Sequence, residues 1–109
     1  MRNKVTLIGN LGQDPQVINL DGGKKMVKLS LATNELYTSK LGIKTEDTQW
    51  HKLVVWGKTA DVAQRFLKKG SEVAVEGKIT YHNYTDKKGE KRYFTEINVS
   101  DIVLLGSAA

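Results

Sequence analysis

The chain contains no cysteine, so it can form neither a disulfide nor a metal site that uses thiolates. The absence of cysteine fits the reducing environment inside a cell. No apolar run approaches the roughly 20 residues that a helix needs to cross a bilayer, so no membrane partner is expected. The N-terminal sequence MRNKVTLIGNLG lacks the long apolar segment of a secretory signal. We therefore expect a cytoplasmic protein.

The sequence also lacks the residue groups of common catalytic and metal sites. Its two histidines, His51 and His82, are far apart in the chain, and no His and carboxylate residues recur at the spacing of metal ligands. The glycines of GNLGQDP and GKTAD match neither the phosphate-binding pattern GxxxxGKS/T nor GxGxxG. No Ser, His and Asp arrangement for nucleophilic catalysis is evident. We therefore expect no enzyme, no metal and no cofactor.

What the sequence does have is an excess of positive charge. Lys and Arg number 17 against 12 Asp and Glu, which gives a net charge of +5. This balance favours a polyanionic partner, although many ordinary soluble domains are equally basic. The length of 109 residues suits one domain over 1–109, with an ordered core over 1–105 and a short tail over 106–109.

Apolar and polar residues alternate in five segments, which predicts five β-strands. The sequence Asp21-Gly22-Gly23 predicts a hairpin turn. A polar, glycine-containing loop is expected over 38–47, and a basic hairpin tip, DKKGEKR, over 86–92. The expected strands cover residues 4–12, 26–37, 48–56, 71–85 and 93–105.

One segment has a clear helical pattern, KTADVAQRFLKKG at residues 58–70. Lys68 and Lys69 would lie in its last turn, and Gly70 would cap its C-terminus. An apolar stripe at helical spacing is formed by Val62, Ala63, Phe66 and Leu67. The order is therefore three strands, a helix and two more strands.

This order predicts an all-β fold, a closed or nearly closed antiparallel barrel of five strands. The single helix would lie between strands 3 and 4, which is the arrangement of an OB-fold. Such folds often bind oligonucleotides or oligosaccharides, but a fold alone does not give a function.

Both tryptophans of the chain lie in one expected strand, within TQWHKLVVWGK at residues 48–58. Alternate side chains of a strand point to opposite faces, so His51, Leu53 and Val55 would face the core. The opposite face of this strand and the matching face of the next would hold Trp50, Lys52, Val54 and Trp56, and Lys78, Thr80, His82 and Tyr84.

An outward face of aromatics and lysines suits a nucleic-acid strand. Stacking a base on an exposed aromatic contributes about 1–3 kcal/mol and tolerates any sequence. Lysines alongside contact phosphates and release counterions. The alternative is that the aromatics pack internally, because tryptophan is usually largely buried. Trp56 would then cap the barrel against the helix, and Lys52 would be an ordinary solvated charge.

Five stretches in collinear order closely resemble the bacterial single-stranded DNA-binding protein family over about residues 3–105: NKVTLIGNLGQDP, LATNE, TQWHKLVVWGK, FLKKGSEVAVEGKI and YTDKKGEKRYFTE. The resemblance implies an OB-fold protomer of a homotetramer. It also implies largely sequence-independent binding of single-stranded DNA during replication, recombination and repair, in a cytoplasmic, nucleoid-associated setting.

The resemblance also implies roles for particular residues, carried over by position. Trp56 is often phenylalanine in the family, and Tyr37 and Tyr84 are often tryptophan, so weaker stacking is expected at the two tyrosines. His51 matches a histidine of the subunit interface. The implied stacking residues are Trp50, Trp56, Tyr84 and Tyr37, and the implied phosphate contacts are Lys52, Lys58, Lys4, Lys69, Lys87, Lys88 and Arg92.

The family usually continues into a Gly/Pro/Gln-rich linker and an acidic tip that recruits replication and repair proteins. This chain stops at LLGSAA, which puts that recruiting role in doubt. An OB-fold replication-restart adaptor, acting mainly through protein partners, is the alternative function. An RNA-binding OB module is a further one, although nothing in the sequence reads a 2′-hydroxyl.

Overall fold

The computed structural model describes residues 2–106. Gly106 ends the last strand, so it is not part of a tail, and residues 107–109 of the expected tail lie outside the described residues. A short 3-10 turn at Asp21–Gly23 closes the expected hairpin. The main elements are β1 (Val5–Leu11), β2 (Gln16–Asn19), β3 (Lys25–Thr38), β4 (Lys44–Trp56), α1 (Gly57–Phe66), β5 (Glu72–Thr85) and β6 (Lys91–Gly106).

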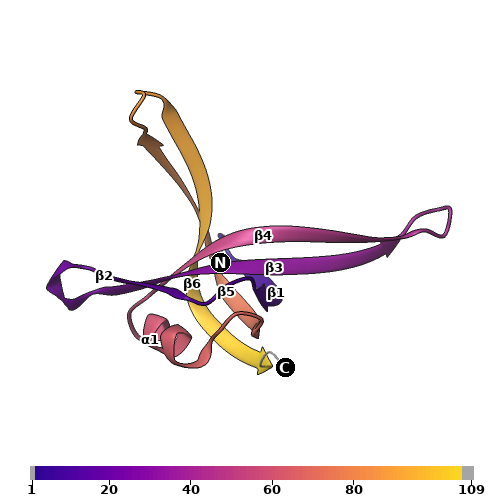
Figure 1. Cartoon of the computed structure of the whole chain (residues 1–109), viewed down its shortest axis with the longest axis horizontal. Coiled ribbons are helices and arrows are strands. Elements are labelled where there is room, and N and C mark those ends of the chain that lie inside the picture. The colour runs from indigo at the N-terminus through magenta and orange to yellow at the C-terminus, as the bar shows by residue number, and fades with distance from the viewer. Residues whose placement is uncertain (1, 107–109) are drawn as a thin grey trace.

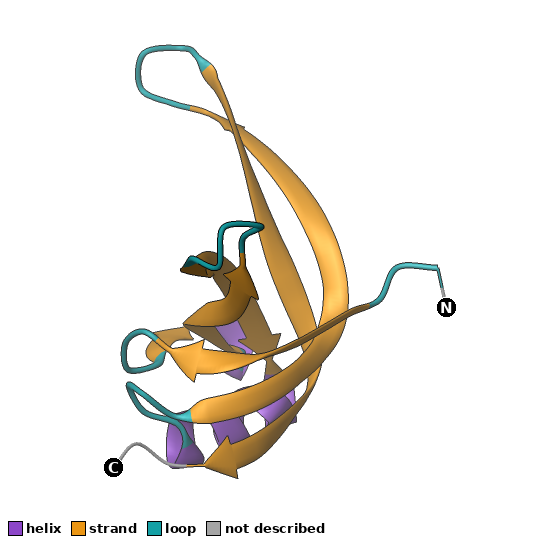
Figure 2. Ribbon diagram, turned by 90° about the vertical axis from the view of Figure 1, so that its right-hand side faces the viewer, coloured by secondary structure: helices purple, strands orange, loops and turns teal. Residues whose placement is uncertain are grey.

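Five of the strands close into a barrel in the order β1–β5–β6–β4–β3 and back to β1 (Figures 1 and 2). The closing pair is short, with Asn10 opposite Ala32 and Leu11 opposite Leu31. The short strand β2 pairs with β3 outside the barrel. The helix α1 connects β4 to β5, the third and fourth barrel strands, which confirms the expected OB-fold.

One pairing differs from the expected antiparallel barrel. β4 and β6 run parallel, with Leu53 opposite Ile97, Val54 opposite Asn98 and Val55 opposite Val99. The other strand pairs are antiparallel. Parallel neighbours need a crossover connection, and here α1 and β5 supply it.

Alternation along the strands builds the barrel core as the sequence predicts. In β1 and β4 the residues of one parity face inward and those of the other parity face solvent or the groove described below. The cluster of buried residues is Leu11, Val27, Leu29, Leu31, Leu53, Val55, Ala60, Ala63, Leu67, Val73, Val75, Ile97 and Val99.

Two hairpins extend well beyond the barrel as two-stranded arms (Figures 1 and 2). We call residues 33–49 the β3–β4 arm and residues 78–96 the β5–β6 arm, because these segments pair only within their own hairpin. The expected loop over 38–47 is therefore partly wrong, since β4 already begins at Lys44. The first residues of β4 are polar on both faces, so the sequence shows no alternation there that would predict a strand. Their extended conformation comes from pairing with β3.

The predicted apolar stripe of the helical segment is half correct. Ala63 and Leu67 are buried as expected, whereas Val62 and Phe66 are 44% and 60% exposed and Ala60, which the stripe did not include, is fully buried. Small alanine side chains let the helix lie close to the barrel, and this outweighs the larger hydrophobicity of Val62 and Phe66. No helix among residues 2–106 is long and apolar enough to cross a membrane.

The helix also ends earlier than expected. It stops at Phe66 with Leu67 as its C-cap, so Lys68 and Lys69 lie beyond the last turn. Gly70, with φ of +89°, belongs to the following turn, in which the Ser71 amide donates to the Lys68 carbonyl at 3.0 Å. This turn leads directly into β5.

The core assignment can be tested with two leucines. Leu53 is almost fully buried in the barrel, so Leu53→Ala should lower the free energy of unfolding by about 2–5 kcal/mol. Leu36 is exposed on the β3–β4 arm, so Leu36→Ala should change it by less than about 0.5 kcal/mol. Urea denaturation followed by circular dichroism measures both values, and equal losses would contradict the assigned core.

Candidate functional site

A groove runs between the outer face of β3 and β4 and the base of the β5–β6 arm. Its larger part has a volume of about 550 Å³ and its smaller part about 390 Å³. The two parts share Lys52, Tyr93, Phe94 and Glu96, so we treat them together as the groove. The other lining residues are Gln13, Gln16, Lys28, Leu29, Ser30, Leu53, Val54, Tyr84 and Arg92 in the larger part, and Trp50, His51, Thr95 and Ile97 in the smaller.

The floor of the groove is formed by the side chains of β4 that point away from the barrel core. Lys52 lies opposite Ser30 of β3, and Val54 lies opposite Lys28. Val54 is only 4% exposed, yet it does not belong to the barrel core cluster. It forms an apolar floor with a lysine on either side.

The two tryptophans lie outside the barrel core. Trp50 is 62% exposed, and its ring lies against Gly12. A Cβ atom at Gly12 would overlap the Cζ3 and Cη2 atoms of Trp50, so glycine leaves the space that this ring occupies. Trp56 is 41% exposed at the end of β4, opposite Met26, and does not line the groove. Both rings therefore present aromatic surface to solvent.

The opposite wall carries aromatics that the sequence analysis only partly identified. Phe94 stacks on His82, with ring centroids 5.0 Å apart and an interplanar angle of 16°. Tyr84 packs at a tilt against the Phe94 ring, with the two ring centroids 6.0 Å apart. Sequence reasoning missed Phe94 and Lys28 as groove residues. Strand alternation was the available signal, because Phe94 shares a face of β6 with Arg92 and Lys28 shares a face of β3 with Ser30.

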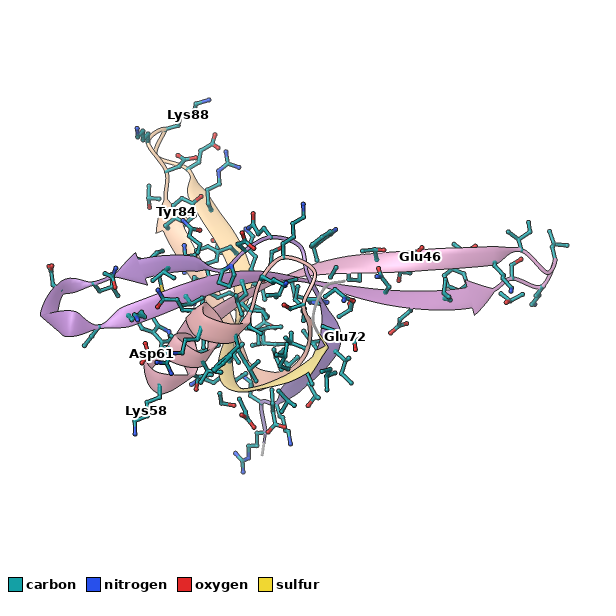
Figure 3. The ribbon with its side chains drawn as sticks, turned by 60° about the horizontal axis from the view of Figure 1, so that its bottom comes forward. Glu46, Lys58, Asp61, Glu72, Tyr84 and Lys88 are labelled. Atoms are coloured by element: carbon teal, nitrogen blue, oxygen red, sulfur yellow. The ribbon has the colours of Figure 1, made fainter. Side chains whose placement is uncertain are left out.

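Several of the expected binding residues lie away from the groove. Lys58 projects from α1, on a different side from Lys88 at the tip of the β5–β6 arm (Figure 3). Lys4 forms an ion pair with Glu76, with Nζ and Oε1 3.3 Å apart. Lys69 lies in the turn after α1, where its amide donates to Oδ1 of Asp14 at 2.8 Å. Contacts of these lysines with a nucleic acid stay predictions.

Tyr37 and His51 share the other parity of the β3–β4 hairpin. Tyr37 is exposed on the β3–β4 arm opposite Thr45, so alternation directs it to the face opposite Trp50. His51 is half-buried, and its Nε2 lies 2.9 Å from Oγ1 of Thr33. Its expected place at a subunit interface stays a prediction, as does stacking by Tyr37.

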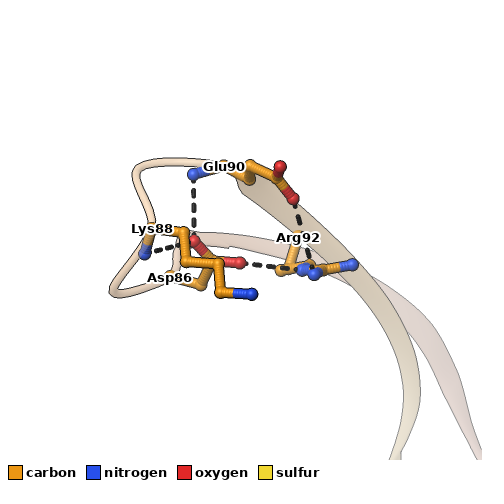
Figure 4. A network of polar contacts seen from close by, with 4 residues as sticks. All are labelled: Asp86, Lys88, Glu90 and Arg92. Carbon is orange, nitrogen blue, oxygen red and sulfur yellow. Dashed lines mark hydrogen bonds and ion pairs between the residues drawn. The ribbon is translucent and has the colours of Figure 1, made fainter.

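The tip of the β5–β6 arm is ordered by one carboxylate (Figure 4). Oδ1 of Asp86 accepts the amides of Lys88 and Glu90 at 2.9 Å each, and Oδ2 accepts Nε of Arg92 at 3.0 Å. The Glu90 amide, and then the Arg92 guanidinium, lower the pKa of Asp86 from its ordinary value of 3.8. Glu90 also pairs with Arg92 at 3.5 Å, so Arg92 is held by two carboxylates.

Lys87 and Lys88 are exposed at this tip and form no ion pair with any residue in the described range 2–106. The free charge at this end of the groove is therefore positive.

Among residues 2–106, no group of three or more His, Cys, Asp or Glu side chains could hold a metal ion.

The role of Asp86 can be tested by substitution and by acid. Asp86→Ala should remove the amide protection of Lys88 and Glu90 in hydrogen exchange while the barrel amides keep theirs, because the tip lies outside the core. Because the folded carboxyl has the lower pKa, its stabilisation of the tip is present above the unfolded pKa. It is lost as the pH falls through the folded pKa, below 3.8.

Glu90→Gln provides the matched control for this tip. Its side chain makes only the longer contact with Arg92, so the amides of Lys88 and Glu90 should stay protected in that variant. Unchanged protection in Asp86→Ala would show that the chain turns without this carboxylate.

Comparison with known proteins places these features in a family. The model of the Single-strand binding protein family matches residues 2–105. The chain is 45% identical over 105 residues to Single-stranded DNA-binding protein 1 of Xylella fastidiosa, covering 95% of this chain and 77% of that protein. It is 42% identical over 106 residues to the protein of the same name from Chlorobaculum tepidum, covering 96% of this chain and 65% of that protein.

Solved structures agree with this relationship. A Plasmodium falciparum SSB in complex with single-stranded DNA superposes with a TM-score of 0.88 at 32% identity, covering 96% of both chains. A deletion mutant of the single-stranded DNA binding protein from Thermus aquaticus gives a TM-score of 0.81 at 30% identity, covering 94% of this chain and 50% of that chain. The resemblance seen in the sequence is confirmed, and the chain belongs to the Single-strand binding protein family.

Proposed function

We propose that this protein binds single-stranded DNA in the groove, largely without regard to base sequence. The observation that carries the proposal is the outward face of β4, where the exposed ring of Trp50 lies beside Lys52 on the groove floor. The names of the relatives and the DNA-bound Plasmodium structure support it.

The binding mechanism follows from the lining residues. Trp50, Phe94 and Tyr84 offer aromatic rings on which bases stack, and every base has a ring face, so stacking discriminates little between them. Lys52 and Lys28 neutralise phosphates and release counterions. Val54 contributes an apolar floor against which bases lose water.

The remaining expected residues would extend the DNA path beyond the groove. Lys87 and Lys88 carry free charge at the end of the β5–β6 arm, whereas Arg92 is already engaged by Asp86 and Glu90. Exposed Trp56 and Tyr37, and the cations Lys4, Lys58 and Lys69, lie on other surfaces of the protomer. A DNA strand that reaches these residues would have to wrap around the protein.

We further propose the cellular setting and assembly that the family resemblance implies. The protein would coat and protect single-stranded DNA during replication, recombination and repair, in the cytoplasm and at the nucleoid. It would act as a homotetramer, with His51 near a subunit interface, and would be a single DNA-binding domain over residues 1–109. Replication and repair proteins are possible partners.

A second candidate is an OB-fold adaptor in replication restart that acts mainly through protein partners. The exposed apolar side chains of Val62 and Phe66 on α1 favour it, because such a surface suits protein contacts. An adaptor would bind single-stranded DNA weakly without its partner. DNA affinity measured on the isolated protein therefore separates the two functions.

Tryptophan fluorescence tests the leading proposal directly. Titration with a long oligo-dT should quench the emission, with affinity falling steeply as salt rises because counterions are released. Duplex DNA of the same length should bind more weakly. Oligo-rU should also bind more weakly than oligo-dT, whereas an RNA-binding module would prefer oligo-rU. A folded protein whose emission stays unchanged at every salt concentration would contradict the stacking role of Trp50 and favour the adaptor.

Substitutions can place the DNA on the groove and on its extension. Trp50→Ala, inside the groove, and Trp56→Ala, outside it, should each weaken oligo-dT binding by about 1–3 kcal/mol, with little change in unfolding free energy because both rings are exposed. Tyr84→Ala should act in the same direction as the tryptophan variants.

Tyr81→Ala is the matched control for Tyr84→Ala. Tyr81 is exposed on the same arm, but its parity directs it to the opposite face. Equal losses of affinity in the two tyrosine variants would move the DNA path off the groove. Unfolding of either tryptophan variant would instead support internal packing of that ring.

A further inference from the structure

The groove contains one negative charge that a DNA-binding surface would be expected to avoid. Of the described residues, Glu96 is the only carboxylate that lines either part of the groove. Its side chain is 20% exposed, so it is partly shielded from water and its charge acts strongly on the groove. An unpaired carboxylate here would repel the phosphates that Lys52 and Lys28 attract.

The partner of Glu96 is a histidine. Nε2 of His82 lies 3.1 Å from Oε1 of Glu96, and this nitrogen also lies 3.3 Å from Oγ1 of Thr80. The His82 ring stacks on Phe94, and an aromatic face stabilises a protonated imidazole. Imidazole gains or loses its proton between about pH 5 and pH 8, so the pair can be either neutral or negative in that range.

Other charged and titratable groups surround this pair. Lys78 and Tyr84 share the parity of His82 on β5, and Arg92 shares the parity of Glu96 on β6. Lys52 of β4 and Lys28 of β3 lie on the floor of the groove. Arg92 is already paired with Asp86 and Glu90. The imidazoles near Glu96 are that of His82 and that of His51, which lines the smaller part of the groove with its Nε2 2.9 Å from Oγ1 of Thr33. Of these two, only His82 is paired with the carboxylate.

We propose that Glu96 and His82 form a proton-dependent charge pair that sets how tightly the groove holds single-stranded DNA, an inference that rests on the proposed function. With a neutral His82 imidazole, Glu96 leaves a net negative charge beside the DNA. With a protonated imidazole, the pair is neutral. Phosphates favour the protonated form, so DNA binding takes up a proton and the affinity rises as the pH falls.

The test is the affinity for oligo-dT at pH 8 and pH 5.5 at constant ionic strength, because thymine does not titrate between these values. The wild-type protein should bind about fivefold more tightly at pH 5.5, the effect of one screened charge interaction. His82→Gln should bind equally at both pH values, at the affinity of the wild type at pH 8. His82→Arg should also be independent of pH, at the higher affinity.

His51→Gln tests the other histidine of the chain, which also lines the groove but contacts Thr33 rather than a carboxylate, so its effect is judged by the ratio of the affinities at the two pH values and not by the affinity itself. It should keep the fivefold rise. Glu96→Gln should bind DNA more tightly at pH 8. NMR of the two imidazole rings should show that His82 gains its proton at a lower pH in Glu96→Gln and at a higher pH when oligo-dT is bound. A purely structural role of Glu96 would move neither titration.

The outcomes separate this inference from the proposed function. A wild-type protein that binds oligo-dT equally at both pH values, or a His82→Gln variant that keeps the rise, overturns the charge pair alone. A wild-type protein that fails to bind oligo-dT at either pH overturns both.

Discussion

The short parallel pairing of β4 with β6 is the constraint on which the rest of the site depends. It joins Leu53 to Ile97 and Val55 to Val99 inside the core, with Val54 and Asn98 between them on the outer face. Beyond this pairing β4 continues along β3 and β6 continues along β5, so the two sheets separate. The groove is the space that this separation leaves, and its lining comes from the residues on either side of the junction.

Some cations of the protein are engaged in ion pairs and others are available. Lys4 and Arg92 are paired with carboxylates, whereas Lys52 and Lys28 face the groove without an ion pair among the described residues. Net charge alone would not distinguish these groups. A polyanion senses the available cations, so the positive field of the groove is stronger than the balance of the whole chain indicates.

Much of the fold could be read from the sequence because each barrel strand has one buried face. Burial of alternate residues imposes a period of two, and this placed the five strands and the inward parity of Leu53 and Val55 correctly. Where neither face is buried, as at residues 44–47, the period disappears and the strand was missed. On the helical segment, the apolar stripe placed Ala63 and Leu67 correctly, but close packing selected Ala60 instead of Val62 and Phe66.

The site was only partly predictable for a related reason. Parity correctly grouped Trp50 with Lys52, because that grouping depends on one strand alone. The approach of Phe94 and Glu96 to Lys52 depends on how the β5–β6 arm curves over β4, and no local pattern encodes that curvature. The pairing of His82 with Glu96 likewise depends on the register of two strands.

The two arms give the molecule an uneven distribution of stability. A two-stranded ribbon is marginally stable alone, whereas the barrel is held by a shared core. Local opening should therefore be easier in the arms than in the barrel, and one wall of the groove belongs to such an arm. If single-stranded DNA binds in the groove as proposed, it can enter and leave by rearrangement of this wall, while the strands that carry Trp50 and Lys52 stay folded.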